Sequence, residues 1–270
     1  MTRAPAPAPA TAHPRAYLLD LDGTLYAGGA AIPGAPDTLR RLRDRGVPYR
    51  LVTNTSSRSR ALLVERLTGY GFAVARDEIF TATLAARDLA RADGHTLVAP
   101  FVSEPALEDL AGLELAGGTA GRKGNRTPDA VLVGDLGERW TFELLQEAFE
   151  YLMQGAELIA LSRDRYWLHQ DRLVLDAGPF VAGLEFASGK SARIAGKPSS
   201  AFYQSALQSL GVEEPEAAAM VGDDLWSDVE GAQRAGLQGW LVRTGKFREP
   251  VLRDSGIRPD RILASVAALP

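Results

Sequence analysis

The sequence predicts an α/β protein in which a doubly wound (Rossmann-like), largely parallel sheet carries a second, inserted α/β domain. Three observations lead to this prediction: short apolar runs alternate with longer amphipathic ones, several runs end in acids or hydroxyls, and the middle of the chain repeats the strand and helix patterns. The apolar runs predict strands at 16–21, 48–53, 95–102, 129–135, 157–162, 191–196, 217–223 and 239–244.

Most segments between these strands have helical patterns. In residues 36–46, Leu39 and Leu42 share one side and Gly46 suits the C-terminal end of a helix. The same kind of pattern predicts helices at 57–71, 141–155, 200–211 and 227–236.

The order of the elements predicts a tail, a core and an inserted cap domain. Residues 1–15 alternate Ala and Pro, and proline removes backbone donors that a helix needs, so we expect a disordered tail. We assign the core to 16–80 and 178–270, and the cap to 81–177.

Two segments of the cap have patterns of their own. Residues 165–178 predict a hairpin with its turn near Gln170 and Asp171. The basic, glycine-rich stretch 117–129 predicts a solvated loop, with a role in holding an anionic substrate as the alternative.

The composition is that of an ordinary soluble globular protein, with 46% hydrophobic and 24% charged residues. A net charge of -4 gives no reason to expect binding to nucleic acid or to an anionic membrane. The absence of cysteine excludes disulfides and thiolate chemistry. No stretch reaches the roughly 18 apolar residues of a membrane span, and we expect a cytoplasmic protein.

Four short motifs together contain what phosphoryl transfer requires. They are Asp20-Leu21-Asp22-Gly23-Thr24, Thr53-Asn54, Gly196-Lys197-Pro198, and Gly222-Asp223-Asp224 with Asp228. Each motif is weak alone, because an acid at a strand end is often a turn former or a helix cap. Ligands of open parallel sheets bind at the carboxyl ends of the strands, so Asp20, Thr53 and Asp223 predict one shared site.

The two acids of the first motif need a positive partner, because a buried carboxylate is costly without one. Mg²⁺ suits this place, since it binds a few carboxylates, a carbonyl, waters and a phosphate oxygen. Asp20 and Asp223 can supply the carboxylates, and the backbone carbonyl of Asp22 lies on the same turn. The carboxylate of Asp20 can attack the phosphorus of a substrate phosphoryl group. Lys197 and Thr53 can hold the oxygens of that group.

Asp22 has a different predicted role. It lies two residues beyond the nucleophile, where its side chain can reach the leaving-group oxygen. It would protonate that oxygen as an acid and activate the hydrolytic water as a base. Gly23 permits the sharp turn after the strand, and the backbone N–H groups there can contribute to a phosphate cradle.

From about residue 16 to 265, the chain resembles the haloacid dehalogenase superfamily of phosphatases. DLDGT matches the first motif of that family, Thr53 the second, Lys197 the third and GDDLWSD the fourth. The long insertion before Lys197 resembles an α/β cap of the second type. Many relatives have Asn-Pro-Asp after the cap strand, where the corresponding stretch of this chain is Ser162-Arg163-Asp164-Arg165, so their substrate habits do not carry over.

The resemblance implies a role for each motif residue. Asp20 is the nucleophile and Asp22 the acid and base. Phosphate binding falls to Thr53, Asn54 and Lys197. The Mg²⁺ ligands are the carboxylates of Asp20 and Asp223 and the backbone carbonyl of Asp22. Asp228 supports the metal or its waters from outside the ligand set.

Other interpretations of single residues stay open. Thr53 could cap the next helix, and Lys197 could be a solvated loop residue. Asp224 should face away from Asp223, so that capping a helix or supporting the metal from outside the ligand set suits it better than ligation. Asp228 stands where acids suit a helix N-terminus.

Within the cap, Tyr166 and His169 could line a substrate pocket or pack on a hairpin face. The sequence decides neither, nor does it assign a role to Arg163.

We therefore expect a Mg²⁺-dependent phosphatase that hydrolyses small phosphomonoesters through a phospho-aspartate on Asp20. A phosphotransferase or mutase with the same intermediate is one alternative, and a non-enzymatic phospho-acceptor module is another. Asp22 favours turnover, because it offers a base to hydrolyse the intermediate. The resemblance also allows a homodimer through the cap. The sequence does not name the substrate.

Overall fold

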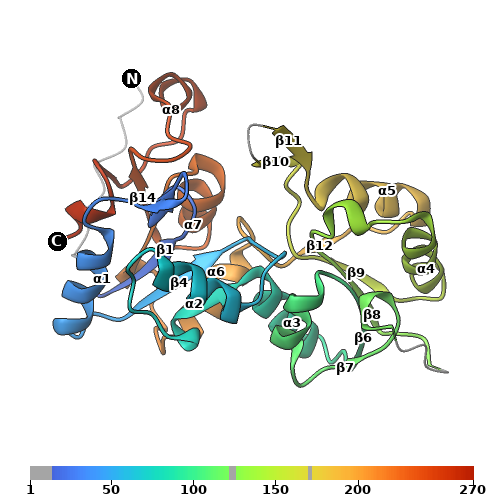
Figure 1. The fold of residues 1–270 in the computed structure, drawn as a ribbon. Coiled ribbons are helices and arrows are strands. Elements are labelled where there is room, and N and C mark those ends of the chain that lie inside the picture. The colour runs from blue at the N-terminus through green and yellow to red at the C-terminus, as the bar shows by residue number, and fades with distance from the viewer. Residues whose placement is uncertain (1–13, 122–125, 170–171) are drawn as a thin grey trace, which may run out of the picture.

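A computed structural model describes residues 14–121, 126–169 and 172–270, and it shows two sheets lying side by side with helices around them (Figure 1). The first sheet is fully parallel, with six strands in the order β15-β14-β13-β1-β4-β5. The strands are β1 (Ala16–Asp20), β4 (Tyr49–Thr53), β5 (Ile79–Thr81), β13 (Ala218–Gly222), β14 (Gln238–Val242) and β15 (Arg261–Leu263). This arrangement confirms the predicted α/β class.

The core sheet is buried on both faces, as parallel sheets usually are. Adjacent residues Leu18 and Leu19 of β1 belong to two different apolar clusters, because successive side chains of a strand point to opposite faces. The core helices are α1 (Ala35–Asp44), α2 (Arg60–Gly69), α6 (Ser200–Gln208), α7 (Gly231–Arg234) and α8 (Glu249–Ser255).

The second sheet forms the centre of the cap, which we define as residues 82–194. Its five strands are also parallel, in the order β12-β9-β8-β6-β7. They are β6 (Leu97–Phe101), β7 (Glu114–Leu115), β8 (Ala130–Val133), β9 (Glu157–Ala160) and β12 (Arg193–Ile194). The α-helices α3 (Ala82–Ala92), α4 (Phe142–Met153) and α5 (Gly178–Ser188) accompany them.

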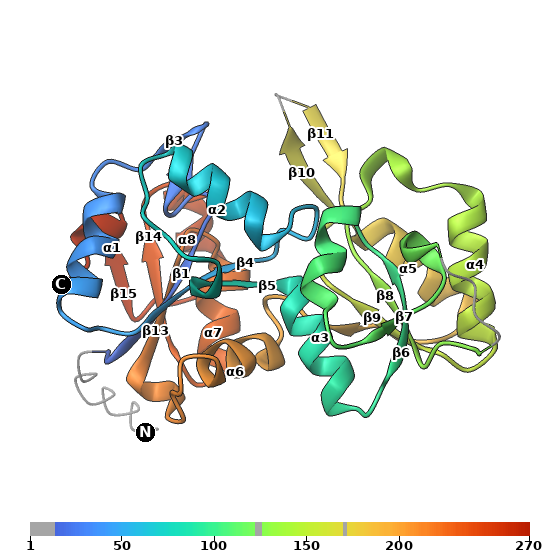
Figure 2. The ribbon, with the colours of Figure 1, turned by 60° about the horizontal axis from the view of Figure 1, so that its bottom comes forward.

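The predicted hairpin projects from the cap (Figure 2). Its antiparallel strands are β10 (Tyr166–His169) and β11 (Arg172–Leu175). The predicted turn at Gln170 and Asp171 lies outside the described residues.

The predicted end of the cap at residue 177 is wrong. The helix α5 buries Val181 and Leu184 in an apolar cluster with Ala148 and Leu152 of α4. The strand β12 pairs with β9, at the edge of the cap sheet. Residues 178–194 therefore belong to the cap, because their apolar side chains complete its interior and not that of the core.

The other differences include the helices α3, α5 and α8, which were not predicted, and several short elements. The predicted strand 191–196 shrinks to the two residues of β12, and the three-residue strands β5 and β15 were not predicted. The predicted helix 227–236 begins instead with a π-helical segment, Leu225–Glu230, whose N-cap is Asp224. Such short segments carry too few residues to show a hydrophobic period.

Core and cap share an apolar cluster. It includes Leu18 and Val52 from the core sheet and Leu132 and Ile159 from the cap sheet. The buried carboxylate of Asp109 in the cap adds an ionic contact, because it accepts hydrogen bonds from two core arginines.

Among the described residues, no helix combines the length and apolar composition needed to cross a membrane.

Candidate active site

The three polar strand ends lie at one edge of the core sheet. The strand β1 lies between β13 and β4, so that Asp20, Thr53 and the residues after Gly222 reach the same edge of the sheet. Asp20 pairs in register with Val52, one residue before Thr53. The parallel crossovers therefore bring together residues about 200 positions apart in the chain.

Three buried carboxylates gather at this edge. Asp20, Asp223 and Asp228 are 7%, 4% and 1% exposed, and oxygens of all three lie within 4.8 Å of one another. The Nζ atom of Lys197, itself 4% exposed, donates to Oδ1 of Asp20 at 2.6 Å and to Oδ1 of Asp228 at 2.7 Å. One ammonium thus faces three carboxylates, which leaves the group negative when all are ionised.

Burial and the neighbouring charges shift the pKa values of this group. Burial raises the pKa of Asp223 to about 6, and the charge of Asp228 adds to the effect. Burial also raises the pKa of Asp20, against the opposing influence of Lys197. The pKa of Lys197 is raised: burial acts to lower it, but the charges of Asp20 and Asp228 outweigh burial.

The donor set fits a hard divalent cation. Oxygen ligands are those that Mg²⁺ prefers, and a second positive charge would offset the burial and the repulsion by Asp228 that together raise the pKa of Asp223. Asp20 and Asp223 offer their carboxylates, and Asp22, whose backbone carbonyl is the third proposed ligand, lies just after the end of β1. Asp228 offers a third carboxylate, of which one oxygen accepts from Lys197 and the other from the backbone N–H of Asp224 at 3.1 Å.

Asp223 lies in a space that glycine alone leaves open. A Cβ atom at Gly23 would lie 1.9 Å from Oδ2 of Asp223, and a Cβ atom at Gly245 would lie equally close. The backbone N–H of Lys246 donates to the same oxygen at 2.7 Å, and the Thr244 hydroxyl donates to the Gly23 carbonyl at 2.5 Å. Both glycines have positive φ, which glycine adopts most readily.

The segment Thr244-Gly245-Lys246 was missed at the sequence level. It begins two residues after the end of a strand, β14, and combines a hydroxyl, a glycine and a cation, a combination that could have indicated a site. The predicted strand 239–244 includes Thr244 and neither of the two residues after it.

The Asn54 side chain is committed to Lys197. Its Oδ1 accepts from the backbone N–H of Lys197 at 2.8 Å, and its Nδ2 donates to the backbone carbonyl of Lys197 at 2.9 Å. A phosphate contact from Asn54 would therefore come from its backbone N–H. The buried hydroxyl of Thr53 accepts from the backbone N–H of Thr55 at 3.0 Å.

Asp224 faces away from Asp223, as expected. Its Oδ1 accepts from the backbone N–H groups of Trp226 and Ser227, and its Oδ2 from Nζ of Lys246 at 2.9 Å. It therefore caps the N-terminus of the helical segment that carries Asp228.

Asp22 is exposed, in contrast to Asp20. Its Oδ2 accepts from the hydroxyl of the buried Tyr26 at 2.8 Å. Burial raises the pKa of that tyrosine, and the charge of Asp22 adds to the effect. Asp22 is thus exposed while its Oδ2 has a buried hydroxyl as its donor.

The cap contributes residues to a pocket next to Lys197. The pocket has a volume of about 430 Å³ and is lined by Arg163, Asp164, Ile194, Lys197, Pro198 and Ser199. Arg163 is paired with Glu185 at 2.6 Å, and Asp164 lies 3.5 Å from Nδ2 of Asn54. Tyr166 is exposed, and the side chain of His169 lies outside the described part of the chain.

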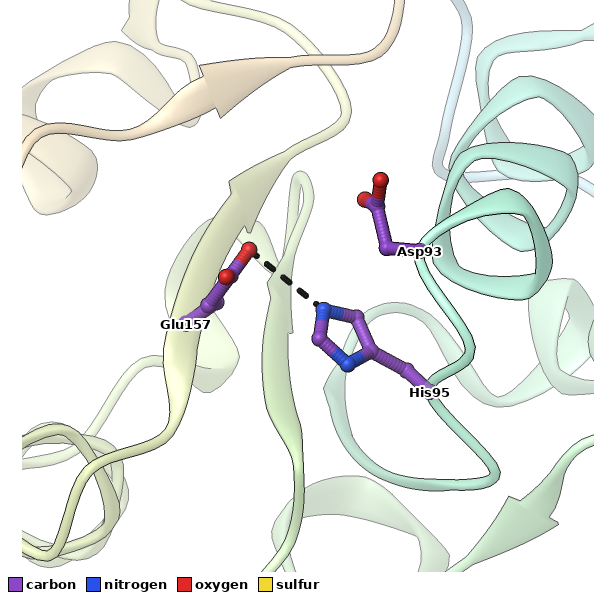
Figure 3. A group of neighbouring side chains, drawn as sticks. All are labelled: Asp93, His95 and Glu157. Carbon is purple, nitrogen blue, oxygen red and sulfur yellow. Dashed lines mark ion pairs between the residues drawn. The ribbon is translucent and has the colours of Figure 1, made fainter.

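A second group of ionisable side chains lies in the cap, away from this site. Figure 3 shows Asp93, His95 and Glu157, with Nε2 of His95 lying 3.4 Å from Oε2 of Glu157. The guanidinium of Arg193 contacts both carboxylates, so a cation already balances them. We interpret this group as an ion-pair cluster that joins β12 and β9 to the end of α3.

A doubly wound sheet that gathers three carboxylates and a lysine at its carboxyl edge is typical of an enzyme acting on phosphate groups. Comparison with known proteins gives the family. A model described as haloacid dehalogenase-like hydrolase matches residues 17–116, and one described as HAD-hydrolase-like matches residues 194–269. The chain belongs to the haloacid dehalogenase-like hydrolases.

Individual relatives cover most of the chain. Haloacid dehalogenase-like hydrolase domain-containing protein 2 from Homo sapiens is 42% identical over 236 residues, 87% of this chain and 86% of that protein. Phospholysine phosphohistidine inorganic pyrophosphate phosphatase from Homo sapiens is 37% identical over 242 residues, 87% of this chain and 84% of that protein. The structure of glycerol phosphate phosphatase from Mycobacterium tuberculosis in complex with magnesium aligns with a TM-score of 0.83 and 29% identity, covering 95% of this chain and 77% of that one.

Proposed function

We propose that this chain is a Mg²⁺-dependent phosphatase that hydrolyses small phosphomonoesters through a phospho-aspartate on Asp20. The observation that carries the proposal is the buried group of Asp20, Asp223 and Asp228 around Lys197. Two relatives support the reaction class and the metal: one is named as a phosphatase of phospholysine, phosphohistidine and inorganic pyrophosphate, and the other is a glycerol phosphate phosphatase in complex with magnesium.

The reaction has two steps. A carboxylate oxygen of Asp20 forms a bond to phosphorus while the bond to the leaving-group oxygen breaks, and Asp22 gives its proton to that oxygen. A water oxygen then attacks phosphorus, Asp22 takes the water proton, and the bond to Asp20 breaks to release phosphate.

The remaining residues hold the phosphoryl group. Lys197, fixed between two carboxylates, offers a positive charge to the phosphate oxygens, and the backbone N–H groups after Asp20 and Thr53 add donors. Mg²⁺, held by Asp20, Asp223 and the Asp22 carbonyl, would neutralise charge between carboxylate and phosphate. Substrates must fit the pocket between Lys197 and the cap, which favours small molecules.

The test is release of phosphate from p-nitrophenyl phosphate by purified protein, with Mg²⁺ or with excess EDTA. We expect metal-dependent release by the native protein and none by Asp20→Asn, which keeps the shape of the side chain but removes the nucleophile. Acid quenching should also trap a phosphoryl group on the native protein and not on that variant. Release that survives Asp20→Asn would refute the proposed nucleophile. Addition of glycerol as an acceptor would detect phosphotransfer as a second product.

A further inference from the structure

We propose that Tyr26 is a positioning residue for the acid and base of the reaction: its hydroxyl holds the Asp22 carboxylate in the orientation from which it serves the leaving group. The inference rests on the proposed function, since it assigns a role to a neighbour of Asp22 in that reaction. Neither residue pattern nor motif had indicated Tyr26.

The contact itself is specific. The Tyr26 hydroxyl donates to Oδ2 of Asp22 at 2.8 Å, while Tyr26 is 2% exposed and Asp22 lies at the surface of the site. A hydrogen bond to a charged acceptor is worth more than one between neutral groups. With Oδ2 held by the phenol, Oδ1 is the oxygen left for proton transfer.

The backbone fixes both ends of this contact. The N–H of Gly23 donates to the Tyr26 carbonyl at 2.7 Å, and the N–H of Tyr26 to the Leu21 carbonyl at 3.3 Å. Asp22 and Tyr26 also form an isolated β-bridge. The turn after β1 therefore brings Tyr26 back beside Asp22.

The ring of Tyr26 is clamped from α2. The guanidinium carbon of Arg66 lies 4.7 Å from the Tyr26 ring centroid, and the Tyr70 ring centroid lies 5.3 Å from it. Arg66 in turn donates through Nε to the Tyr70 hydroxyl at 3.2 Å. A phenol packed in this way has no freedom to follow a moving carboxylate, so the carboxylate is held in place by the phenol.

A positioning role predicts a dependence on the leaving group. Protonation by Asp22 matters greatly when a poor leaving group such as phenolate departs, and little when p-nitrophenolate departs, because the latter is a stable anion. These two substrates have nearly the same shape. Loss of the Tyr26 hydroxyl should therefore reduce kcat/KM for phenyl phosphate by about tenfold or more and for p-nitrophenyl phosphate by less than about threefold.

The experiment compares Tyr26→Phe with the native protein on both aryl phosphates at saturating Mg²⁺. Tyr49→Phe is the matched control, because Tyr49 is 7% exposed and packs in the same apolar cluster as Tyr26. Its hydroxyl donates to the carboxylate of Glu78 at 2.5 Å, and this pair does not belong to the active site. We expect the control to behave as the native protein. We also expect Tyr26→Phe to cost little or nothing further in an Asp22→Asn background, because both changes remove the same function.

The outcomes separate the two proposals. A native protein inactive on both esters would overturn the proposed function and this inference with it. An active native protein with equal losses on both substrates in Tyr26→Phe, or with none, would overturn the positioning role alone. If Tyr26→Phe does not fold, the variant to use is Arg66→Gln, which removes the cation over the ring at a partly exposed position. We expect it to reduce kcat/KM for phenyl phosphate more than for p-nitrophenyl phosphate, by a smaller factor than Tyr26→Phe would. Equal reductions on the two substrates would refute the positioning role.

Discussion

The side chain of Asn54 binds both polar backbone groups of Lys197, accepting from its N–H at 2.8 Å and donating to its carbonyl at 2.9 Å. Through these two bonds, the loop after β4 fixes the residue whose ammonium lies between Asp20 and Asp228. The second motif thus positions the third, and the site depends on an amide that touches neither the nucleophile nor the proposed metal.

Asn54→Ala should weaken this arrangement. We expect kcat for p-nitrophenyl phosphate to fall by about 10- to 100-fold, because Lys197 loses its fixed position. The free energy of unfolding should fall by about 1–3 kcal/mol through the two lost hydrogen bonds. Steady-state kinetics and urea unfolding measure the two effects. A variant with native kcat would show that Lys197 is held well enough by its carboxylates alone.

Lys197→Met should affect both stability and activity. It leaves the buried carboxylates of Asp20 and Asp228 without their ammonium, at an expected cost of about 3–5 kcal/mol in the metal-free protein. Added Mg²⁺ should restore part of this loss, since it supplies positive charge to the same group. Activity should fall by about 100-fold or more. The control Lys190→Met changes a lysine whose Nζ makes an exposed contact with a backbone carbonyl, and it should change neither quantity.

Gly245→Ala should weaken metal binding. The added methyl group would lie 1.9 Å from Oδ2 of Asp223, so that the carboxylate must move. We expect the Mg²⁺ concentration for half-maximal thermal stabilisation to rise by about 10- to 100-fold. Gly256→Ala controls for backbone strain: Gly256 also has positive φ, but its Cβ would meet open space. Equal effects in the two variants would attribute the loss to strain and not to Asp223.

The cap contains an acid that should make folding depend on pH. Burial raises the pKa of Asp176 to about 6, with Asp135 and Asp164 adding to the effect. Its pKa in the unfolded chain is about 4, so between these values the folded state binds more protons. Stability is therefore lost as pH rises from about 4 to 6, by up to about 3 kcal/mol from this group.

Asp176→Asn should remove this contribution and be more stable than the native protein above pH 6. Urea unfolding measures the free energy of unfolding at pH 4.5 and at pH 7, which are about 0.5 unit above the lower pKa and about 1 unit above the higher pKa. Saturating Mg²⁺ keeps the active-site acids ionised at both. The control Asp254→Asn, at an exposed position beside Arg253, should show the same change in the free energy of unfolding between the two pH values as the native protein. The same change in Asp176→Asn would show that Asp176 does not titrate in this range.

Several features could be predicted from local patterns. Apolar runs that end in acids placed β1 and β13 correctly, and helical spacing placed α1, α2, α4 and α6. Short elements such as β5 and β15 escaped, because three residues carry no measurable period. Residues 178–194 were assigned to the wrong side of the boundary, since their apolar side chains suit either interior.

By itself, the sequence determined the identity and order of the motifs, since an acid, a hydroxyl or a glycine at a strand end is a local feature of the chain. Only the tertiary structure decided which of their atoms meet. It brought Gly245 against Asp223, turned the Asn54 amide toward Lys197, and placed Tyr26 under Asp22. These contacts depend on the order of strands in the sheet and on the path of each turn, which arise from packing over the whole molecule and leave no repeat in the sequence.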